Sequence, residues 1–193
     1  MKNSFFALIA RSRNIARWGL MRNGFTENAQ EHAAASAVIA HALAVIRNRE
    51  FGGDADTGMC AVAALYHDAA EIITGDLPTP IKYNNPELTE AYKRVEAVAV
   101  TTLLNALPEA MRPDYAEALS GGAGETRLIV KAADKLAAYI KCVQERCGGN
   151  SEFLSAEKNT LAALTAMQLP EVNYFIENFM PAFGLNLDEL TGN

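Results

Sequence analysis

Histidine, cysteine and tryptophan are scarce in this chain of 193 residues, which contains three histidines, three cysteines and one tryptophan. The cysteines are Cys60, Cys142 and Cys147. Their odd number and the absence of any Cys-x-x-Cys pair argue against a disulfide framework and against a thiolate zinc site. We therefore expect small buried thiols in a protein of the reducing cytosol.

Positive charge and long apolar runs are also in short supply. The 17 basic residues are outnumbered by 23 acidic ones, so the net charge is −6, and no nucleic-acid partner held by a basic surface is expected. The longest apolar run, residues 33–46, is too short to span a bilayer and contains His41. The apolar patch at residues 5–10 is followed at once by Arg11 and Arg13, without a small-residue cleavage site, which predicts a mature helix instead of a signal peptide.

Glycine and proline number only 13 and 7, whereas alanine and leucine are abundant, a composition that favours helices over strands. No stretch shows the alternation and hairpin turn of a strand pair. We predict an all-α, multi-helix bundle that forms a single domain over residues 1–193, long enough to bury a core without disulfides. The helices are expected at about residues 4–16, 29–49, 57–74, 86–106, 108–120, 125–147, 151–167 and 170–183.

Capping residues and prolines set several of these boundaries. Asn28 with Glu31 three residues later has the pattern of a capping box, and Asn85-Pro86 is a cap followed by a proline at the first helical position. The segment Asp76–Pro80 contains two prolines and therefore predicts an ordered turn instead of a regular helix.

The most informative stretch for chemistry is Tyr66–Glu71, with the sequence Tyr-His-Asp-Ala-Ala-Glu. On a regular helix, His67 and Glu71 share a face, and Asp68 lies about 100° around. Imidazole and carboxylate side by side suit a divalent ion. The alternative is an amphipathic helix whose polar residues face water, but charge in so apolar a segment is costly without a partner.

Two further features have two interpretations each. His32 and His41 are nine residues apart on one predicted helix and point to opposite faces, so only one of them can join a given centre, and the residues alone do not decide which. Asp134, in an apolar helix, is either a buried ligand or the ion-pair partner of a nearby lysine, Lys131 or Lys141.

The pair Arg17-Trp18 is expected to end the first predicted helix. Arginine binds phosphate with a fork of donors, and tryptophan offers a face for a base or sugar. The alternative is a solvent-facing arginine beside a core tryptophan. As the single tryptophan of the chain, placed next to an arginine, Trp18 favours a functional interpretation.

In this order the motifs resemble the HD-domain metal-dependent phosphohydrolases, whose pattern is a histidine, a His-Asp doublet and a later aspartate. More narrowly, the chain resembles the bacterial 5′-deoxynucleotidases of that superfamily over about residues 5–190. The turn Thr74–Pro80 and the Arg-Trp pair are the more selective likenesses. The matching segments are Arg17-Trp18, Thr26–Asn28, Glu31-His32, His67–Glu71, Thr74–Pro80, Lys131–Asp134 and Ala138–Lys141.

This resemblance implies a role for each matching residue. It selects His32 over His41. The implied ligands of one divalent ion (Co, Mn or Mg) are His32, His67, Asp68 and Asp134. Glu71 would transfer a proton. The implied substrate-binding residues are Arg17 at the phosphate, Trp18 at the sugar, and Asp76, Leu77, Pro78 and Thr79 at the rim.

The implied activity is hydrolysis of 2′-deoxyribonucleoside 5′-monophosphates to deoxynucleoside and phosphate, by a cytoplasmic homodimer without membrane partners. Two alternatives are an HD phosphohydrolase acting on another nucleotide, such as a deoxynucleoside triphosphate or a signalling nucleotide, and a non-catalytic nucleotide or metal sensor. A triphosphate enzyme would be expected to carry more basic residues around its site than Arg17 alone.

Overall fold

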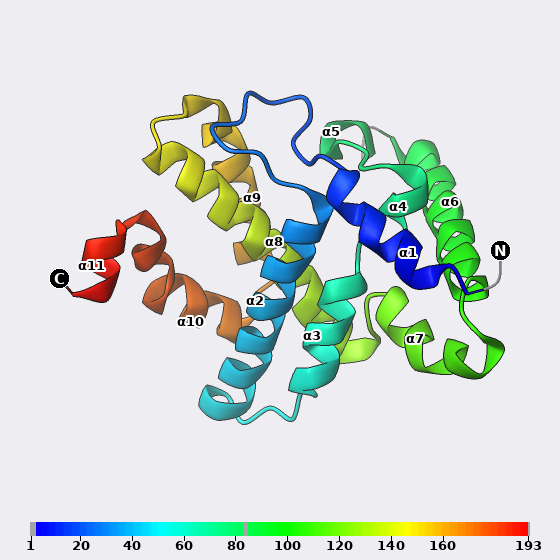
Figure 1. Ribbon diagram of the computed structural model, residues 1–193. Coiled ribbons are helices and arrows are strands. Elements are labelled where there is room, and N and C mark those ends of the chain that lie inside the picture. Colours follow the sequence, from blue (N-terminus) through cyan, green and yellow to red (C-terminus); the bar gives the residue numbers. More distant parts are fainter. Residues whose placement is uncertain (1–2, 83–84, 193) are drawn as a thin grey trace.

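Helices account for nearly all of the regular structure in residues 3–82 and 85–192, the part of the chain that the computed structural model describes (Figure 1). The prediction of an all-α multi-helix bundle is confirmed. Extended pairing in this part is limited to an isolated antiparallel bridge between Ala16 and Asn28. The α-helices are α1 (Phe5–Ile9), α2 (Ala29–Glu50), α3 (Thr57–Tyr66), α4 (Glu71–Thr74), α5 (Thr79–Lys82), α6 (Pro86–Asn105), α7 (Arg112–Leu119), α8 (Gly124–Cys147), α9 (Leu154–Ala166), α10 (Pro170–Asn178) and α11 (Leu187–Thr191). The 3₁₀ helices are η1 (Ala10–Asn14), η2 (Glu109–Met111), η3 (Ser151–Phe153) and η4 (Met180–Gly184).

The helices α2, α3 and α8 form the centre of the molecule (Figure 1). Their facing sides are rich in alanine, whose small side chain lets the helix backbones approach closely, and Leu43 and Leu136 are fully buried there. Burial of a leucine side chain contributes about 1.5–3 kcal/mol. A second apolar cluster joins α1 to α6 and α7 through Phe5, Leu103 and Leu119. The central cluster holds the helices that carry the candidate ligands.

The predicted capping box starts α2. The Asn28 side chain accepts hydrogen bonds from the backbone N–H groups of Gln30 and Glu31, both at 3.0 Å, and the Glu31 carboxylate accepts one from the backbone N–H of Asn28 at 2.9 Å. Such a cap stabilises a helix by about 1 kcal/mol. Since His32 lies four residues after Asn28, this local signal also sets the face on which His32 lies.

The prediction of one helix over residues 57–74 is wrong at its centre. The helix α3 ends at Tyr66, and hydrogen bonds to the third preceding residue then run from Ala69 N to Tyr66 O and from Glu71 N to Asp68 O. This tight turn precedes the short helix α4. His67 and Glu71 are therefore not stacked along one regular helix.

Other boundaries also differ from the predictions. The first helical segment ends at Asn14, so Arg17-Trp18 lie beyond a short extended stretch instead of ending a helix. The prolines of the 76–80 segment do not keep it wholly non-helical, because α5 begins at Thr79. The structure adds a terminal helix, α11, which a capping box at Asn186 starts.

A buried ion pair ties the loop after Trp18 to α8. Lys141 and Glu145 are each 2% exposed and pair one helical turn apart. The Glu145 carboxylate also accepts hydrogen bonds from the backbone N–H groups of Gly24 at 2.8 Å and Phe25 at 3.3 Å. Burial raises the pKa of Glu145, but hydrogen bonds from Lys141, Asn150 and these backbone groups outweigh it and lower the pKa to about 2.

Within the described ranges, each helix is too short or too polar to cross a bilayer.

Candidate metal centre

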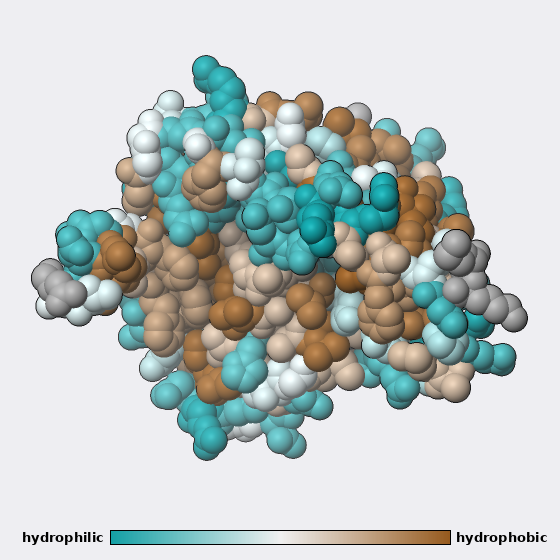
Figure 2. Space-filling view, in the orientation of Figure 1, coloured by the Kyte–Doolittle hydropathy of each residue, from teal (hydrophilic) through white to brown (hydrophobic). Residues whose placement is uncertain are grey.

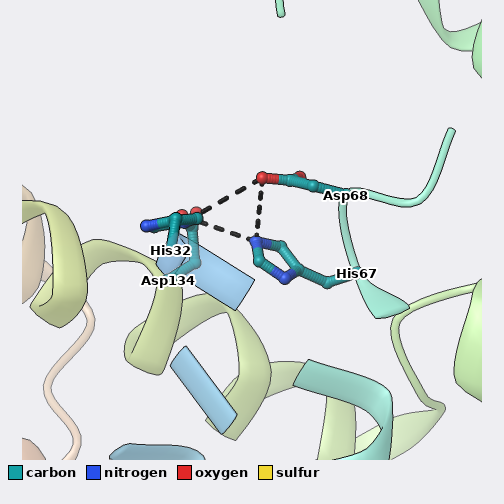
Figure 3. Close-up of side chains that lie close together, drawn as sticks. All are labelled: His32, His67, Asp68 and Asp134. Atoms are coloured by element: carbon teal, nitrogen blue, oxygen red, sulfur yellow. Dashed lines mark hydrogen bonds and ion pairs between the residues drawn. The ribbon is translucent and has the colours of Figure 1, made fainter. Parts of the chain in front are cut away.

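Four side chains from three separate parts of the chain converge at one point of the bundle (Figure 3). His32 comes from α2, His67 and Asp68 follow α3, and Asp134 comes from α8. One potential ligand atom from each lies within 4.8 Å of all the others. We call these residues the four-residue cluster. His41 lies outside it and is exposed.

The cluster is held by short contacts between nitrogen and oxygen atoms. His32 Nε2 lies 3.0 Å from Asp134 Oδ1, and His67 Nε2 lies 3.1 Å from Asp68 Oδ2. The cross contacts are longer, at 3.9 Å from His32 Nε2 to Asp68 Oδ2 and 3.7 Å from His67 Nε2 to Asp134 Oδ1. Since Asp134 pairs with two histidines, neither lysine pairing considered for it occurs; Lys141 instead pairs with Glu145.

The break after Tyr66 orients His67. Its Nδ1 lies 2.6 Å from the Ala64 carbonyl oxygen, which only accepts hydrogen bonds, so Nδ1 carries the proton and Nε2 is turned toward the cluster. A second hydrogen bond of this kind is how proteins set the tautomer and ring orientation of a metal-binding histidine. The tight turn then lets Asp68, the next residue, reach the same point as His67.

The titration behaviour of the cluster reflects opposite charges packed together. Burial lowers the pKa of His67, but Asp68 and Asp134 outweigh it and raise the pKa well above its ordinary value. Burial would raise the pKa of Asp134, but the hydrogen bond from His32 and the nearby imidazole of His67 bring it well below its ordinary value. A metal ion binding here would therefore compete with a proton for His67.

The chemistry of the donor set fits a divalent cation. His67 Nε2 is buried and has no hydrogen-bond partner among residues 3–82 and 85–192, although it faces carboxylate oxygens. His32 is fully buried. Two imidazoles and two carboxylates supply a mixed nitrogen and oxygen set that suits first-row divalent ions. A cation among them would compensate the carboxylate charges and give His67 Nε2 a partner.

Glu71 lies beside the cluster without belonging to it. It begins α4, is 7% exposed, and its Oε2 is buried without a hydrogen-bond partner in the described part of the chain. Burial, followed by the negative charges of Asp68 and Asp76, raises the pKa of Glu71 from 4.5 to about 8. In the metal-free protein, this carboxyl group is therefore protonated at neutral pH.

Arg17 contacts the cluster from the extended segment before α2. Its Nη1 donates to Asp68 Oδ2 at 3.2 Å, and its Nε lies 3.5 Å from Glu27 Oε2. Burial lowers the pKa of Arg17, but the carboxylates of Asp68, Asp134 and Glu71 raise it overall. The guanidinium is thus held against the cluster with its charge maintained.

Trp18 combines features of both interpretations made from the sequence. Its ring is half-buried and packs edge-on against Phe153, with centroids 5.3 Å apart. Its indole N–H donates to Glu27 Oε2 at 2.8 Å. No role was assigned to Glu27 from the sequence. The only feature of the sequence that pointed to it was its position within the matching segment Thr26–Asn28.

The turn after α4 lies close enough to the cluster to influence it electrostatically. Asp76, Leu77 and Pro78 are half-buried, and the side chain of Thr79 lies outside the described residues. Burial raises the pKa of Asp76, and Arg17 partly opposes that shift. The turn is tied to α6, because the Tyr92 hydroxyl donates to the Gly75 carbonyl oxygen at 3.2 Å.

Comparison with known proteins gives consistent matches. A family model for 5′-deoxynucleotidase YfbR-like proteins matches residues 4–183. The 5′-deoxynucleotidase YfbR of Shigella boydii serotype 18 is 46% identical over 194 residues, which cover 99% of this chain and 98% of that protein. A 5′-deoxynucleotidase of Yersinia pestis (strain Pestoides F) is 46% identical over 189 residues, covering 97% of this chain and 96% of its own.

Solved structures share the fold. An HD-domain phosphohydrolase from Listeria innocua superposes with a TM-score of 0.81 at 23% identity, covering 98% of this chain and 95% of its own. The HD phosphohydrolase of cyanophage S-2L, solved with dA and one catalytic Zn²⁺ ion, has a TM-score of 0.68 at 20% identity and covers 94% of this chain and 99% of its own.

Proposed function

The chain belongs to the YfbR-like 5′-deoxynucleotidase family, and from that premise we propose how its side chains carry out the reaction of that family. It is a 5′-deoxynucleotidase, which hydrolyses a 2′-deoxyribonucleoside 5′-monophosphate to a deoxynucleoside and phosphate. The observation that carries the mechanism is the four-residue cluster, with Glu71 and Arg17 beside it.

His32, His67, Asp68 and Asp134 hold one divalent ion in this proposal. When bound, the ion supplies positive charge to a phosphoryl oxygen and lowers the pKa of a bound water. The candidates are Co²⁺, Mn²⁺ and Mg²⁺, and the Zn²⁺ of the cyanophage neighbour adds a fourth ion to test. The two imidazole nitrogens and two carboxylates of the cluster support this role, because such donors suit divalent ions.

Arg17 binds the phosphate of the substrate. Its described contacts use Nη1 and Nε, which leaves Nη2 for a phosphate oxygen. A guanidinium suits this task because its planar fork of donors matches phosphate oxygens and it stays charged at all relevant pH values. The substrate phosphate would thus lie between Arg17 and the cluster.

Glu71 supplies the proton that the leaving group needs. As water attacks phosphorus in line, the bond from phosphorus to the 5′-oxygen breaks, and that oxygen takes a proton from the Glu71 carboxyl group. One proton of the attacking water stays on the phosphate product, and the other restores the Glu71 carboxyl group. Burial favours this role because it keeps the group protonated to a higher pH than an exposed glutamate. The four-residue cluster supplies the ligands, so Glu71 is free for proton transfer.

Trp18 selects against ribonucleotides by shape in this proposal, and the turn with Asp76, Leu77, Pro78 and Thr79 holds the substrate at the rim. Replacing Trp18 by alanine should lower the ratio of kcat/KM for a deoxynucleotide to that for its ribonucleotide by about tenfold, since a ring that excludes the 2′-hydroxyl is lost. Steady-state kinetics on both nucleotides measures this. An unchanged ratio removes that role from Trp18.

Phosphate release from a panel of nucleotides tests the activity. The panel contains mono- and triphosphates, deoxy and ribo, each with Mg²⁺, Mn²⁺, Co²⁺ and Zn²⁺. We expect turnover of deoxynucleoside monophosphates and little of the others. Preferred release from triphosphates would favour the alternative of a triphosphohydrolase, and no release with any metal-loaded sample would favour a sensor.

Assembly and location complete the proposal. We propose a cytoplasmic homodimer, supported by exposed apolar side chains on α2 and α3. Figure 2 shows hydrophobic residues at the surface over these two helices. The exposed side chains there include Val38, Val45, Val62 and Leu65. Sedimentation of the purified protein gives the oligomeric state.

A further inference from the structure

We infer that Glu27 is a positioning residue that holds Arg17 and Trp18 in one arrangement, so that phosphate binding and sugar discrimination depend on the same carboxylate. This inference rests on the proposed function, because it assumes that Arg17 and Trp18 contact the nucleotide. Glu27 itself touches neither the four-residue cluster nor Glu71 in the described contacts.

A single oxygen atom of Glu27 serves both neighbours. Glu27 Oε2 accepts a hydrogen bond from the Trp18 indole N–H at 2.8 Å and lies 3.5 Å from Arg17 Nε. The side chains of Arg17 and Glu27 are each 13% exposed. The contact with Trp18 is a hydrogen bond to a charged acceptor, which is stronger than one between neutral groups. The contact with Arg17 is an ion pair without a hydrogen bond at Nε, and it attracts the guanidinium toward the same oxygen.

The backbone of Glu27 joins the same unit to α2. Its carbonyl oxygen accepts a hydrogen bond from Arg17 N at 3.0 Å, and the adjacent Ala16 and Asn28 form the isolated bridge. Asn28 is the N-cap of α2, which carries His32 four residues later. Glu27 therefore lies where the segment with Arg17 and Trp18 is tied to a helix of the cluster.

Trp18 needs such support because its backbone is in an unfavourable region. Its φ angle is 57°, in the left-handed region that residues other than glycine rarely adopt. Conformations of this kind persist when surrounding contacts determine them. The described side-chain contacts of Trp18 are the hydrogen bond to Glu27 and the packing against Phe153. Without the carboxylate, the indole N–H would lose this acceptor, while the packing against Phe153 would remain.

The test compares E27A and E27Q in the intact enzyme. Glutamine still offers an oxygen to the indole N–H but carries no charge for Arg17. Trp18 is the single tryptophan, so intrinsic tryptophan emission reports its surroundings directly. We expect E27A to shift that emission, lower the deoxy-to-ribo ratio of kcat/KM, and raise KM about tenfold with a smaller change in kcat. E27Q should keep the emission maximum of wild type, and its deoxy-to-ribo ratio of kcat/KM should lie within about twofold of wild type.

A matched control removes another ion pair of the same loop. Arg22 pairs with Glu152 at 2.6 Å, and its side chain is 90% exposed. R22A should leave emission, ratio and KM unchanged. If E27A does not fold, E27M provides the same comparison, because methionine keeps the side-chain length without an acceptor.

Two results would overturn the inference. One is a variant without an acceptor that keeps wild-type emission and the wild-type deoxy-to-ribo ratio. The other is E27Q with emission and ratio altered as much as in E27A. Failure of the proposed function looks different, because the wild-type enzyme would then release no phosphate from deoxynucleoside monophosphates, whereas the emission data would still report on Glu27 and Trp18.

Discussion

Replacing Glu71 by glutamine should lower kcat by about 100- to 10,000-fold while the metal ion still binds. Glutamine fills the same space but has no proton to give to the leaving 5′-oxygen. Glu71 is not part of the four-residue cluster, so the metal content should match that of wild type. Single-turnover phosphate release, with metal analysis of the same sample, measures both quantities.

The pH profile gives this prediction a second readout. If the protonated carboxyl group is the acid, wild-type kcat/KM falls as pH rises through the pKa of Glu71, which is about 8 in the metal-free protein. A bound cation favours the charged carboxylate and moves that fall to lower pH. The residual activity of E71Q should lack the fall.

Unfolding can be separated from lost chemistry at this position. The pKa of Glu71 is raised in the folded protein, so ionising this group destabilises the fold. The loss of stability is complete above about pH 8. E71Q removes that cost and should be at least as stable as wild type there, by thermal denaturation without metal. Turnover within about twofold of wild type in E71Q would end the proposed role.

The second large effect concerns two histidines of the same helix. H32N should weaken metal binding by more than about 100-fold, since loss of a mere supporting hydrogen bond at a metal site costs about 10- to 100-fold. H41N should leave it within about twofold. Competition with a coloured chelator measures both affinities, and phosphate release should follow them.

The pair is matched by residue type and helix but not by surroundings. His32 is fully buried, whereas His41 is exposed. Thermal denaturation of both variants without metal shows how much stability the buried substitution costs. Folded H32N that binds metal as tightly as H41N would remove His32 from the ligand set.

The fold class and several helix starts could be predicted from the sequence because short-range physics controls them. Abundant alanine and leucine favour helices, and Asn28 and Asn85 satisfy the first free N–H groups of α2 and α6. The motif order, read through family resemblance, also named the residues that the structure brings together at the cluster. The residues alone left open whether Asp134 is a buried metal ligand or the ion-pair partner of a lysine.

The tertiary structure decided what depends on contacts between distant segments. His32 and Asp134 are 102 residues apart, and only the packing of α2 against α8 places them 3.0 Å from each other. The helix break after Tyr66 also escaped prediction, although it is local, because an apolar helical pattern does not reveal the hydrogen bond from the His67 side chain to the Ala64 carbonyl three residues earlier. Glu27 escaped because its partners meet it through a bridge between extended segments.

The scarcity of histidine and positive charge thus limited the candidates, whereas packing selected among them. A sequence specifies local propensity within a few residues, so it determines helices and caps. The raised pKa of Glu71 and the contacts of the Glu27 carboxylate with Arg17 and Trp18 come from burial and from neighbours across the fold. Those properties exist only once the helices have packed, because burial removes the water that would otherwise screen each charge.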